Sequence, residues 1–277
     1  MNIGIRMHDL AAGTLEERAG FAKAQGFSCV HLAMSKVISP AYMDPAVATP
    51  GLAAYLNKAL NGLDTAVLGC YLNLTHPDET VYRETLRKYT AHLQLCSWMN
   101  AGVVGTETGN PNAEYRYDPD RSHTEDALKL FIDRVAPVIE TAEKVGATLA
   151  IEPVYKHIVS DGKRARKVLD AFHSPNLKII LDPVNLLHPD NLARREAVID
   201  EAIELLGDEV AIIHLKDYIS TSTGRTECAC GLGEMDYTNI LRFAKERKPH
   251  IQMTLECTKP DNAEAARLHI ERLAAAL

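Results

Sequence analysis

Apolar and polar positions along this chain follow two alternating periods. Short runs of mostly apolar, often β-branched residues are followed by longer stretches in which apolar residues recur every three or four positions. The first pattern is typical of strands covered on both faces, and the second of amphipathic helices. Eight strands are predicted in this way, at 2–7, 29–33, 66–72, 101–106, 148–153, 177–182, 210–215 and 251–257.

Helical periodicity fills the intervals between these strands. The clearest helical stretches lie at 15–25, 52–63, 79–98, 125–145, 192–206 and 263–275. Two of them begin with the spacing of a capping box, Thr14 with Glu17 and Ser122 with Glu125, which predicts a helix start at each place. Pro137 lies inside the fourth stretch and is expected to kink or split that helix, because proline cannot donate a backbone hydrogen bond.

Repeated alternation of strand and helix predicts parallel βαβ units, and eight units predict an α/β fold of the (β/α)8 TIM barrel type. About 250 residues is the usual length of such a barrel, so residues 1–277 are expected to form a single domain. A doubly wound open sheet is the rival architecture. It is disfavoured because the chain has no Gly-rich turn after its first strand. Two polar, Gly-containing loops, at 107–121 and 219–233, are long enough to be functional.

Composition narrows the class of function. The formal net charge of −7 and the lack of any Lys or Arg cluster argue against nucleic-acid binding and favour a small-molecule substrate. No apolar run is long enough to span a membrane. The N-terminus lacks the features of an export signal, and the six cysteines lack zinc-finger spacing. Reduced thiols and a cytoplasmic location are therefore expected.

Four strands carry a metal-ligating type of side chain at their carboxyl ends, which is the active-site face of a parallel barrel. These residues are Glu152, Asp182, His214 and Glu256. Any one of the acidic residues alone could simply end its strand or cap the next helix. Closure of the barrel would bring all four together, and unpaired carboxylates so close need a cation. Such an oxygen-rich set predicts one divalent metal ion, with Mn²⁺ favoured and Mg²⁺, Co²⁺ or Zn²⁺ as alternatives.

The residues around these positions carry a family resemblance. The whole chain resembles the xylose isomerase-like TIM barrels, in particular the sugar phosphate isomerases and epimerases related to D-tagatose 3-epimerase, hydroxypyruvate isomerase and inosose dehydratase. The most specific matches are Ile151-Glu152-Pro153, Leu181-Asp182-Pro183-Val184-Asn185, His214-Leu215-Lys216-Asp217, 231–237 and Leu255-Glu256. The resemblance implies that Glu152, Asp182, His214 and Glu256 are the four ligands of a single metal.

Two departures from the family pattern matter. Asn185 stands where the epimerases usually carry a histidine, which separates this chain from a ketohexose 3-epimerase. The related metal-dependent endonucleases need further histidines after the seventh strand, and 219–233 contains none. A role in DNA repair is therefore disfavoured, in agreement with the acidic net charge.

The resulting hypothesis is a metal-dependent isomerase or epimerase of a sugar or keto-sugar. The metal would hold a substrate carbonyl and its neighbouring hydroxyl so that an enediolate forms, with Glu152 and Glu256 removing and returning the proton. Epimerisation, isomerisation and dehydration remain open. One alternative is a metal-dependent dehydratase or lyase acting on a keto-inositol or 3-keto sugar, and another is a non-catalytic sugar-binding barrel.

Other polar residues near the predicted catalytic face are candidates for binding a sugar-like substrate. His31 is either a core histidine or a pocket residue, and Arg225 is a candidate for holding an anionic group. Asp217 is expected to orient its neighbours rather than bind metal. A homo-oligomer is left open. The predicted substrate-binding residues are Arg6, His8, His76, Glu107, Lys156, His157, Asn185 and Lys216, with Lys36 and Asn73 as further candidates.

Overall fold

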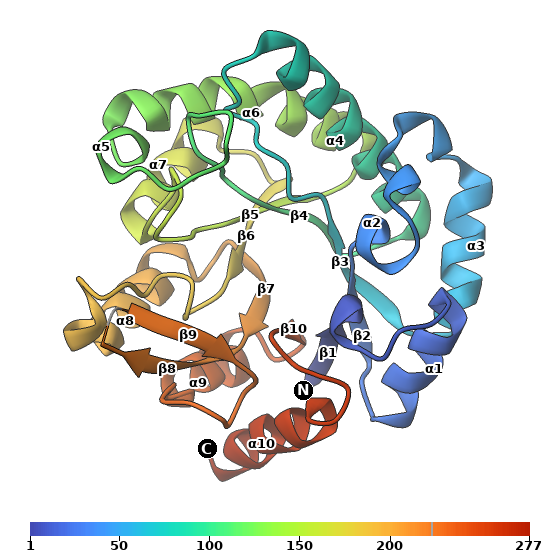
Figure 1. Cartoon of the computed structure of the whole chain (residues 1–277), viewed down its shortest axis with the longest axis vertical. Helices are drawn as coiled ribbons and strands as arrows, with labels where there is room; N and C mark the ends of the chain where they lie inside the picture. The colour runs from blue at the N-terminus through green and yellow to red at the C-terminus, as the bar shows by residue number, and fades with distance from the viewer. Residues whose placement is uncertain (223) are drawn as a thin grey trace.

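The computed structural model describes residues 1–222 and 224–277, and its centre is a closed barrel of eight parallel strands (Figure 1). Around the barrel the strands follow the order β1-β10-β7-β6-β5-β4-β3-β2. The predicted α/β TIM barrel is therefore confirmed. The barrel strands are β1 Asn2–Arg6, β2 Cys29–Leu32, β3 Asp64–Gly69, β4 Val103–Glu107, β5 Leu149–Glu152, β6 Leu177–Leu181, β7 Val210–Leu215 and β10 Gln252–Leu255.

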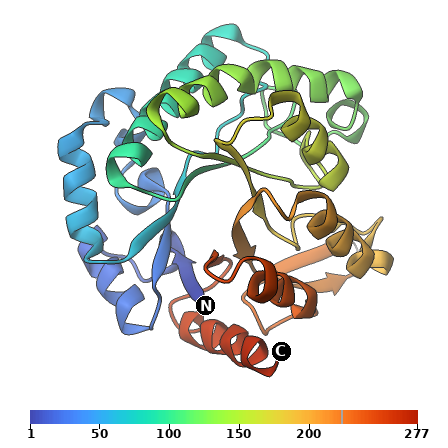
Figure 2. The same cartoon turned by 180° about the vertical axis from the view of Figure 1, so that it is seen from behind.

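Helices form a ring outside the barrel, as the front and back views both show (Figures 1 and 2). The longer ones are α1 Leu15–Ala24, α3 Pro50–Leu60, α4 Glu79–Met99, α6 Glu125–Val145, α7 Gly162–Phe172, α8 Arg195–Leu206, α9 Thr238–Arg247 and α10 Ala263–Ala276. Short helical turns lie at α2 Met34–Val37, α5 Pro119–Ser122, Met7–Asp9, Pro40–Met43, Pro45–Val47 and Leu192–Arg194. Among the described residues, no helix combines the length and the apolar character needed to cross a bilayer.

The start of α6 corrects one of the two predicted capping boxes. The box at the start of α1 is present, with both of its hydrogen bonds. At α6, however, the cap is Thr124, whose side chain accepts a hydrogen bond from the Ala127 N–H, and Ser122 is not the cap. Ser122 is buried, and its hydroxyl donates to the Asn110 side chain at 2.7 Å. Of the two outcomes expected at Pro137, a kink or a split, the split does not occur, because α6 runs unbroken through this residue.

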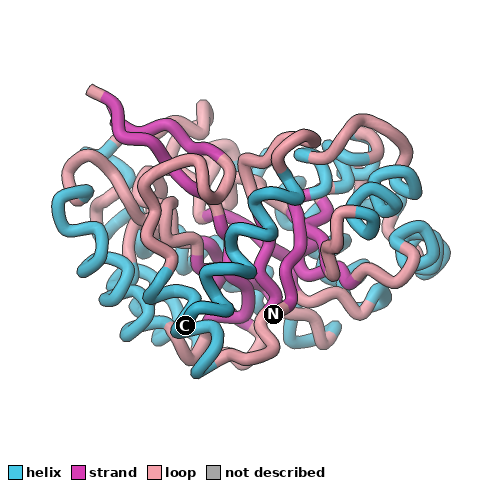
Figure 3. Tube along the Cα trace, turned by 90° about the horizontal axis from the view of Figure 1, so that it is seen from below, coloured by secondary structure: helices cyan, strands magenta, loops and turns pink. Residues whose placement is uncertain are grey.

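The predicted loop at 219–233 is in part a β-hairpin. Strand β8, Asp217–Thr221, pairs antiparallel with β9, Gly224–Cys228, and residue 223 between them lies outside the described residues. The prediction failed because much of the hairpin is exposed, so its residues show no apolar alternation. Seen from the side, the hairpin stands at the end of the barrel away from the N-terminus (Figure 3).

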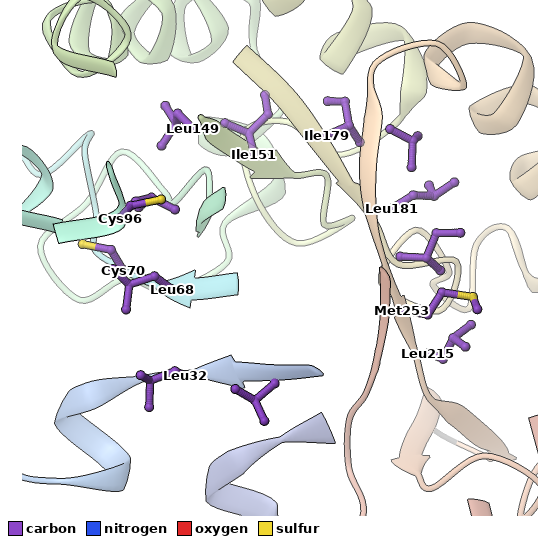
Figure 4. Close-up of a cluster of buried hydrophobic side chains, with 14 of the residues drawn as sticks. Leu32, Leu68, Cys70, Cys96, Leu149, Ile151, Ile179, Leu181, Leu215 and Met253 are labelled. Atoms are coloured by element: carbon purple, nitrogen blue, oxygen red, sulfur yellow. The ribbon is translucent and has the colours of Figure 1, made fainter. Parts of the chain in front are cut away.

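Two apolar layers hold the barrel. The outer layer lies between strands and helices, and includes Leu32 of β2, Leu149 and Ile151 of β5, and Met253 of β10 (Figure 4). A second cluster of small apolar side chains is separate from the first. Ala150 and Ile180 of this second cluster alternate along their strands with residues of the first, so the second cluster fills the inside of the barrel. Its members are Cys29, Ala66, Val67, Val103, Ala150, Ile180 and Ile212.

Candidate functional site

A pocket of about 450 Å³ opens at the carboxyl ends of the barrel strands. Both predicted catalytic glutamates, Glu152 and Glu256, line it. His31 and Lys36 also line it, so His31 is a pocket residue as well as a buried one. Seven of the eight predicted substrate-binding residues lie in its wall: Arg6, His8, Glu107, Lys156, His157, Asn185 and Lys216.

The eighth, His76, lies elsewhere. It is not among the residues that line this pocket, and its Nδ1 accepts a hydrogen bond from the Asp78 N–H at 3.1 Å, just before α4. Asn73 is also outside the pocket lining, and its side-chain amide donates to the backbone oxygens of Asn110 and Asn112. The loop after β3 therefore uses these polar side chains to hold its own backbone and that of the loop after β4.

The four predicted metal ligands meet around the imidazole of His214. The Nδ1 atom of His214 lies 3.4 Å from Glu152 Oε2 and 3.4 Å from Glu256 Oε1. Glu152, Asp182 and His214 each place a ligand atom within 4.8 Å of the others. The parallel register explains why Glu256 lies beside His214. Thr254 of β10 is paired with His214, and Glu256 follows Thr254 by two residues on the same face.

His214 Nε2 has no hydrogen-bond partner among the described residues, and the groups beside His214 Nδ1 and Asp182 Oδ2 are charged side chains at ion-pair distance. Both His214 and Asp182 are fully buried. Buried polar atoms are normally satisfied, so these atoms mark a place where a cation would fit. The other oxygen of Asp182 accepts from the Val184 and Asn185 N–H groups, which fixes the carboxylate in position. Three carboxylates and an imidazole are suitable donors for Mn²⁺ or Zn²⁺.

The Lys216 ammonium lies against the same carboxylates. Its Nζ is 3.1 Å from Asp182 Oδ2 and 3.5 Å from Oε2 of both Glu256 and Glu227. Burial alone would lower the pKa of Lys216, but these three carboxylates raise it well above its usual value. Arg6 adds a second cation, 3.3 Å from Glu256 Oε2. The cluster thus has positively charged partners of its own, and they compensate part of its negative charge.

Titration within the cluster follows from its burial and charges. The carboxylates of Glu152 and Glu256 outweigh the effect of burial and raise the pKa of His214 to about 9. Burial raises the pKa of Asp182 to about 6, against the opposing effect of Lys216. Without metal the imidazole therefore keeps its proton at neutral pH. Metal binding at His214 would release that proton, as is general for histidine ligands.

His31 packs beside the predicted ligands. It forms a second possible ligand group with His214 and Glu256, and its Nδ1 lies 3.8 Å from Glu256 Oε1. The His31 and His214 rings are nearly parallel, with centroids 5.4 Å apart. Gly69 makes room for this arrangement, because a Cβ atom there would lie 2.8 Å from His31 Nε2. Burial and the neighbouring His214 hold the pKa of His31 well below its usual value.

Glu227 and Tyr71 are among the residues of the pocket wall that were not predicted. Glu227 comes from β9 of the hairpin, and Tyr71 follows β3 and stacks on His31 with ring centroids 5.5 Å apart. Recognition of the hairpin would have been needed to find Glu227. Glu107, which was predicted, accepts a hydrogen bond from the Tyr115 hydroxyl at 3.1 Å and lies 3.7 Å from His157 Nδ1.

Asp217 and Arg225 hold the hairpin in place. The Asp217 carboxylate accepts backbone hydrogen bonds from Tyr218, Gly231 and Met235, so it orients the segment after β7, as expected. Arg225 donates through Nε to a backbone oxygen, and its Nη1 lies 2.9 Å from Glu227 Oε1. Asp217 therefore holds the hairpin to the segment that follows it, and Arg225 holds the hairpin to the loop after β6.

Comparison with known proteins gives a family match and a set of similar structures. The xylose isomerase-like TIM barrel family matches residues 19–276. At the level of sequence, no curated protein matches this chain. The structure of 3-keto-D-glucoside 4-epimerase from E. coli is similar, with a TM-score of 0.76, 15% identity, and 99% of each chain covered.

Two further structures are similar over nearly their full lengths. One is the IOLI protein, solved with a bound zinc atom, with a TM-score of 0.74 and 15% identity over 100% of this chain and 97% of that one. The other is the probable 3-DHS dehydratase from Bacillus anthracis, with a TM-score of 0.73 and 16% identity over 99% and 98%. At these identities the likeness shows a shared fold. The reaction has to be argued from the residues of this chain.

Proposed function

Because the chain belongs to the xylose isomerase-like TIM barrel family, we propose that it is a divalent-metal-dependent isomerase or epimerase of a sugar or keto-sugar. The observation that carries this proposal is the convergence of Glu152 and Glu256 on His214, each at 3.4 Å, in the wall of one pocket. Two carboxylates that flank a ligand cluster and also face the same cavity are suited to moving a proton on a bound substrate.

The proposed metal ligands are Glu152, Asp182, His214 and Glu256. Their donor set favours Mn²⁺, with Mg²⁺, Co²⁺ and Zn²⁺ as alternatives, and the zinc atom of the IOLI structure keeps zinc among them. When bound, the metal supplies polarisation of a substrate carbonyl and stabilises negative charge on its oxygen.

The side chains around the pocket divide the remaining work. Glu152 or Glu256 removes a proton from the carbon beside the carbonyl, and the other returns it, to the opposite face or to the neighbouring carbon. The Asn185 side chain donates to Glu152 Oε1 at 2.6 Å and orients that carboxylate. Arg6 and Lys216, beside Glu256, would stabilise negative charge that develops on the substrate. Glu107, His8, Lys156 and His157 would bind substrate hydroxyls from the rest of the wall.

The family also contains the chemistry of the main alternative, since one similar structure is that of a probable dehydratase. Loss of a hydroxyl from the same enediolate would give a dehydrated product, so the product separates the two reactions. We further propose that residues 1–277 form one domain that acts in the cytoplasm on a small molecule, as the acidic net charge and six free cysteines favour.

The test is exchange of substrate hydrogen with deuterated water. The Mn²⁺-loaded protein is incubated with a panel of ketoses and keto-inositols, and deuterium incorporation is followed by NMR. We expect exchange with at least one compound, lost in both Glu152→Gln and Glu256→Gln and kept in Glu140→Gln, whose side chain is 67% exposed on α6. Undiminished exchange in either pocket variant would remove that glutamate from the mechanism.

A further inference from the structure

A second cavity adjoins the pocket of the proposed reaction. It has a volume of about 400 Å³, close to the 450 Å³ of the first. The two cavities share four wall residues, Val154, Lys156, Asn185 and Glu227. Residues that line both cavities place the two side by side, so a ligand that extends past these residues would reach from the first cavity into the second. A cavity of several hundred Å³ usually holds a ligand as large as a whole ring or larger. A single small group would fill only part of it.

Three segments build this second cavity, and each is fixed. Tyr155, after β5, donates its N–H to the Asn185 backbone oxygen, after β6, at 2.8 Å. Arg225 of β9 donates through Nε to the Leu187 backbone oxygen at 3.0 Å. The Tyr155 and His188 rings lie parallel, with centroids 4.3 Å apart. These contacts join the loop after β5, the loop after β6 and the hairpin into one wall.

The chemistry of this wall suits a neutral polar ring. Lys156 makes no hydrogen bond or ion pair with any described residue, and the same holds for Nη2 of Arg225, so both offer free donors. Glu227 supplies carboxylate acceptors beside them, and the paired rings of Tyr155 and His188 supply a flat apolar surface. Hydroxyl groups both donate and accept, so a sugar ring would match donors and acceptors in one wall.

An anion is a poorer occupant. Glu227 lines the cavity, and the Asp190 carboxylate lies behind its wall, accepting from the Tyr155 hydroxyl and lying 3.0 Å from His188 Nδ1. These two carboxylates would repel a negatively charged ligand. A single phosphate would also leave most of the 400 Å³ unfilled.

We propose that the second cavity is a subsite for a second ring, so that the substrate is a glycoside of a keto-sugar. Its reacting ring, whose keto group lies on a carbon other than the glycosidic one, occupies the first pocket. This proposal rests on the proposed function, because that function is what makes the first pocket the place of reaction. The hairpin then has a role in specificity, since β9 supplies Arg225 and Glu227 to the wall that the second ring would contact.

Calorimetric titration of the Mn²⁺-loaded protein tests the subsite. The probes are D-glucose, D-galactose and D-mannose, each as the free sugar and as its phenyl glycoside. We expect at least one glycoside to bind about tenfold more tightly than its free sugar, a difference of ~1.4 kcal/mol. Arg225→Ala and His188→Ala should remove that advantage, and His188→Ala, which breaks no contact of Glu227, should leave the affinity for the free sugar unchanged. Both residues line the second cavity and neither lines the first.

Arg166→Ala is the matched control, because Arg166 is also ion-paired, to Asp170 and Glu209, but lies outside both cavities. The proposal is wrong if none of the three glycosides binds more tightly than its free sugar, or if the advantage survives both cavity variants. Competition of inorganic phosphate with the glycoside would also overturn it, in favour of an anion site. If free ketoses exchange deuterium but no glycoside binds more tightly than its free sugar, the proposed function stands and the subsite is refuted. If a glycoside binds more tightly but no ketose exchanges deuterium, the subsite stands and the proposed function is refuted.

Discussion

The two ends of the barrel interior are equally buried but chemically opposite. Toward the amino ends of the strands the interior side chains are apolar, whereas at the carboxyl ends they are charged or titratable. Single strands supply both layers. The pairs, two residues apart on one face, are Cys29 and His31, Ala150 and Glu152, Ile180 and Asp182, and Ile212 and His214.

Within one set of strands, the apolar layer contributes stability and the titratable layer contributes function. Burial of the apolar layer stabilises the barrel, because it removes apolar surface from water and fills the interior. Burial of the titratable layer costs free energy, which its internal ion pairs offset only in part. A buried titratable layer next to a well-packed apolar layer marks a functional site. Its position at the carboxyl ends of the strands is where parallel barrels have their active sites.

The largest effect on stability is expected from the apolar layer. Ile180 is fully buried, so Ile180→Ala should lower the free energy of unfolding by about 4 kcal/mol, since it leaves a cavity in packed surroundings. Mn²⁺ affinity should change little. Denaturant unfolding and calorimetric metal titration measure the two quantities. If Ile180→Ala lost Mn²⁺ binding but kept its stability, the apolar layer would not have the purely stabilising role that we assign to it.

In the titratable layer, Lys216→Met should act in opposite directions on the metal-free and metal-loaded protein. Removing the ammonium takes away the ion-pair partner of Asp182 Oδ2 and leaves Glu256 with Arg6 as its neighbouring cation, so the metal-free protein should lose ~3 kcal/mol of stability. Mn²⁺ should then bind about tenfold more tightly, because it no longer competes with a cation already present. Thermal unfolding with and without Mn²⁺ measures both effects.

Lys36→Met is the control for this experiment, because Lys36 lines the same pocket but forms no ion pair with a described residue. It should leave metal affinity unchanged. Weaker Mn²⁺ binding in Lys216→Met would mean that the ammonium supports the metal site rather than competing with it.

Stability of the pocket wall should depend on pH through His157. Burial lowers the pKa of His157 to about 4 from its usual 6.5, so the unfolded chain takes up the proton first as the pH falls. The stability that the neutral ring contributes is complete above pH 6.5 and is lost toward pH 4. Between pH 7 and pH 5, wild type should therefore lose on the order of 2 kcal/mol more than His157→Gln. Equal losses in the two proteins would refute this, and exposed His250→Gln serves as the control.

The smallest effect is expected at a helix start away from both layers. Thr124 caps α6, and Thr124→Ala should cost about 1 kcal/mol of stability without changing Mn²⁺ affinity. Chemical unfolding of this variant beside Glu125→Gln, which leaves the cap intact, measures the effect. A change in metal affinity would show that α6 is coupled to the site.

The sequence predicted the barrel and the titratable layer for a physical reason. Buried strands and amphipathic helices have distinct apolar periods, so eight units could be counted, and strand ends placed Glu152, Asp182, His214 and Glu256 on one face. The structure brings these side chains around His214. Whether they bind metal together remains a prediction.

Features that depend on the particular contacts of a loop or of one side chain were not predicted. The β8–β9 hairpin has no apolar alternation, so Glu227 was missed as part of the pocket wall. Ser122 had the spacing of a cap, but its burial against Asn110 gave it another role. His76 was assigned to the pocket from its position after a strand, yet the loop turns it toward the start of α4. A contact with a residue twelve positions away decided the case of Ser122, and a contact only two residues away decided that of His76.

Anomalous X-ray diffraction from a crystal soaked in Mn²⁺ tests the central claim most directly. We predict a single anomalous peak within bonding distance of Glu152, Asp182, His214 and Glu256, and no such peak in crystals of Asp182→Ala prepared in the same way. A peak elsewhere, or none at these four side chains in the wild-type crystal, would contradict the account.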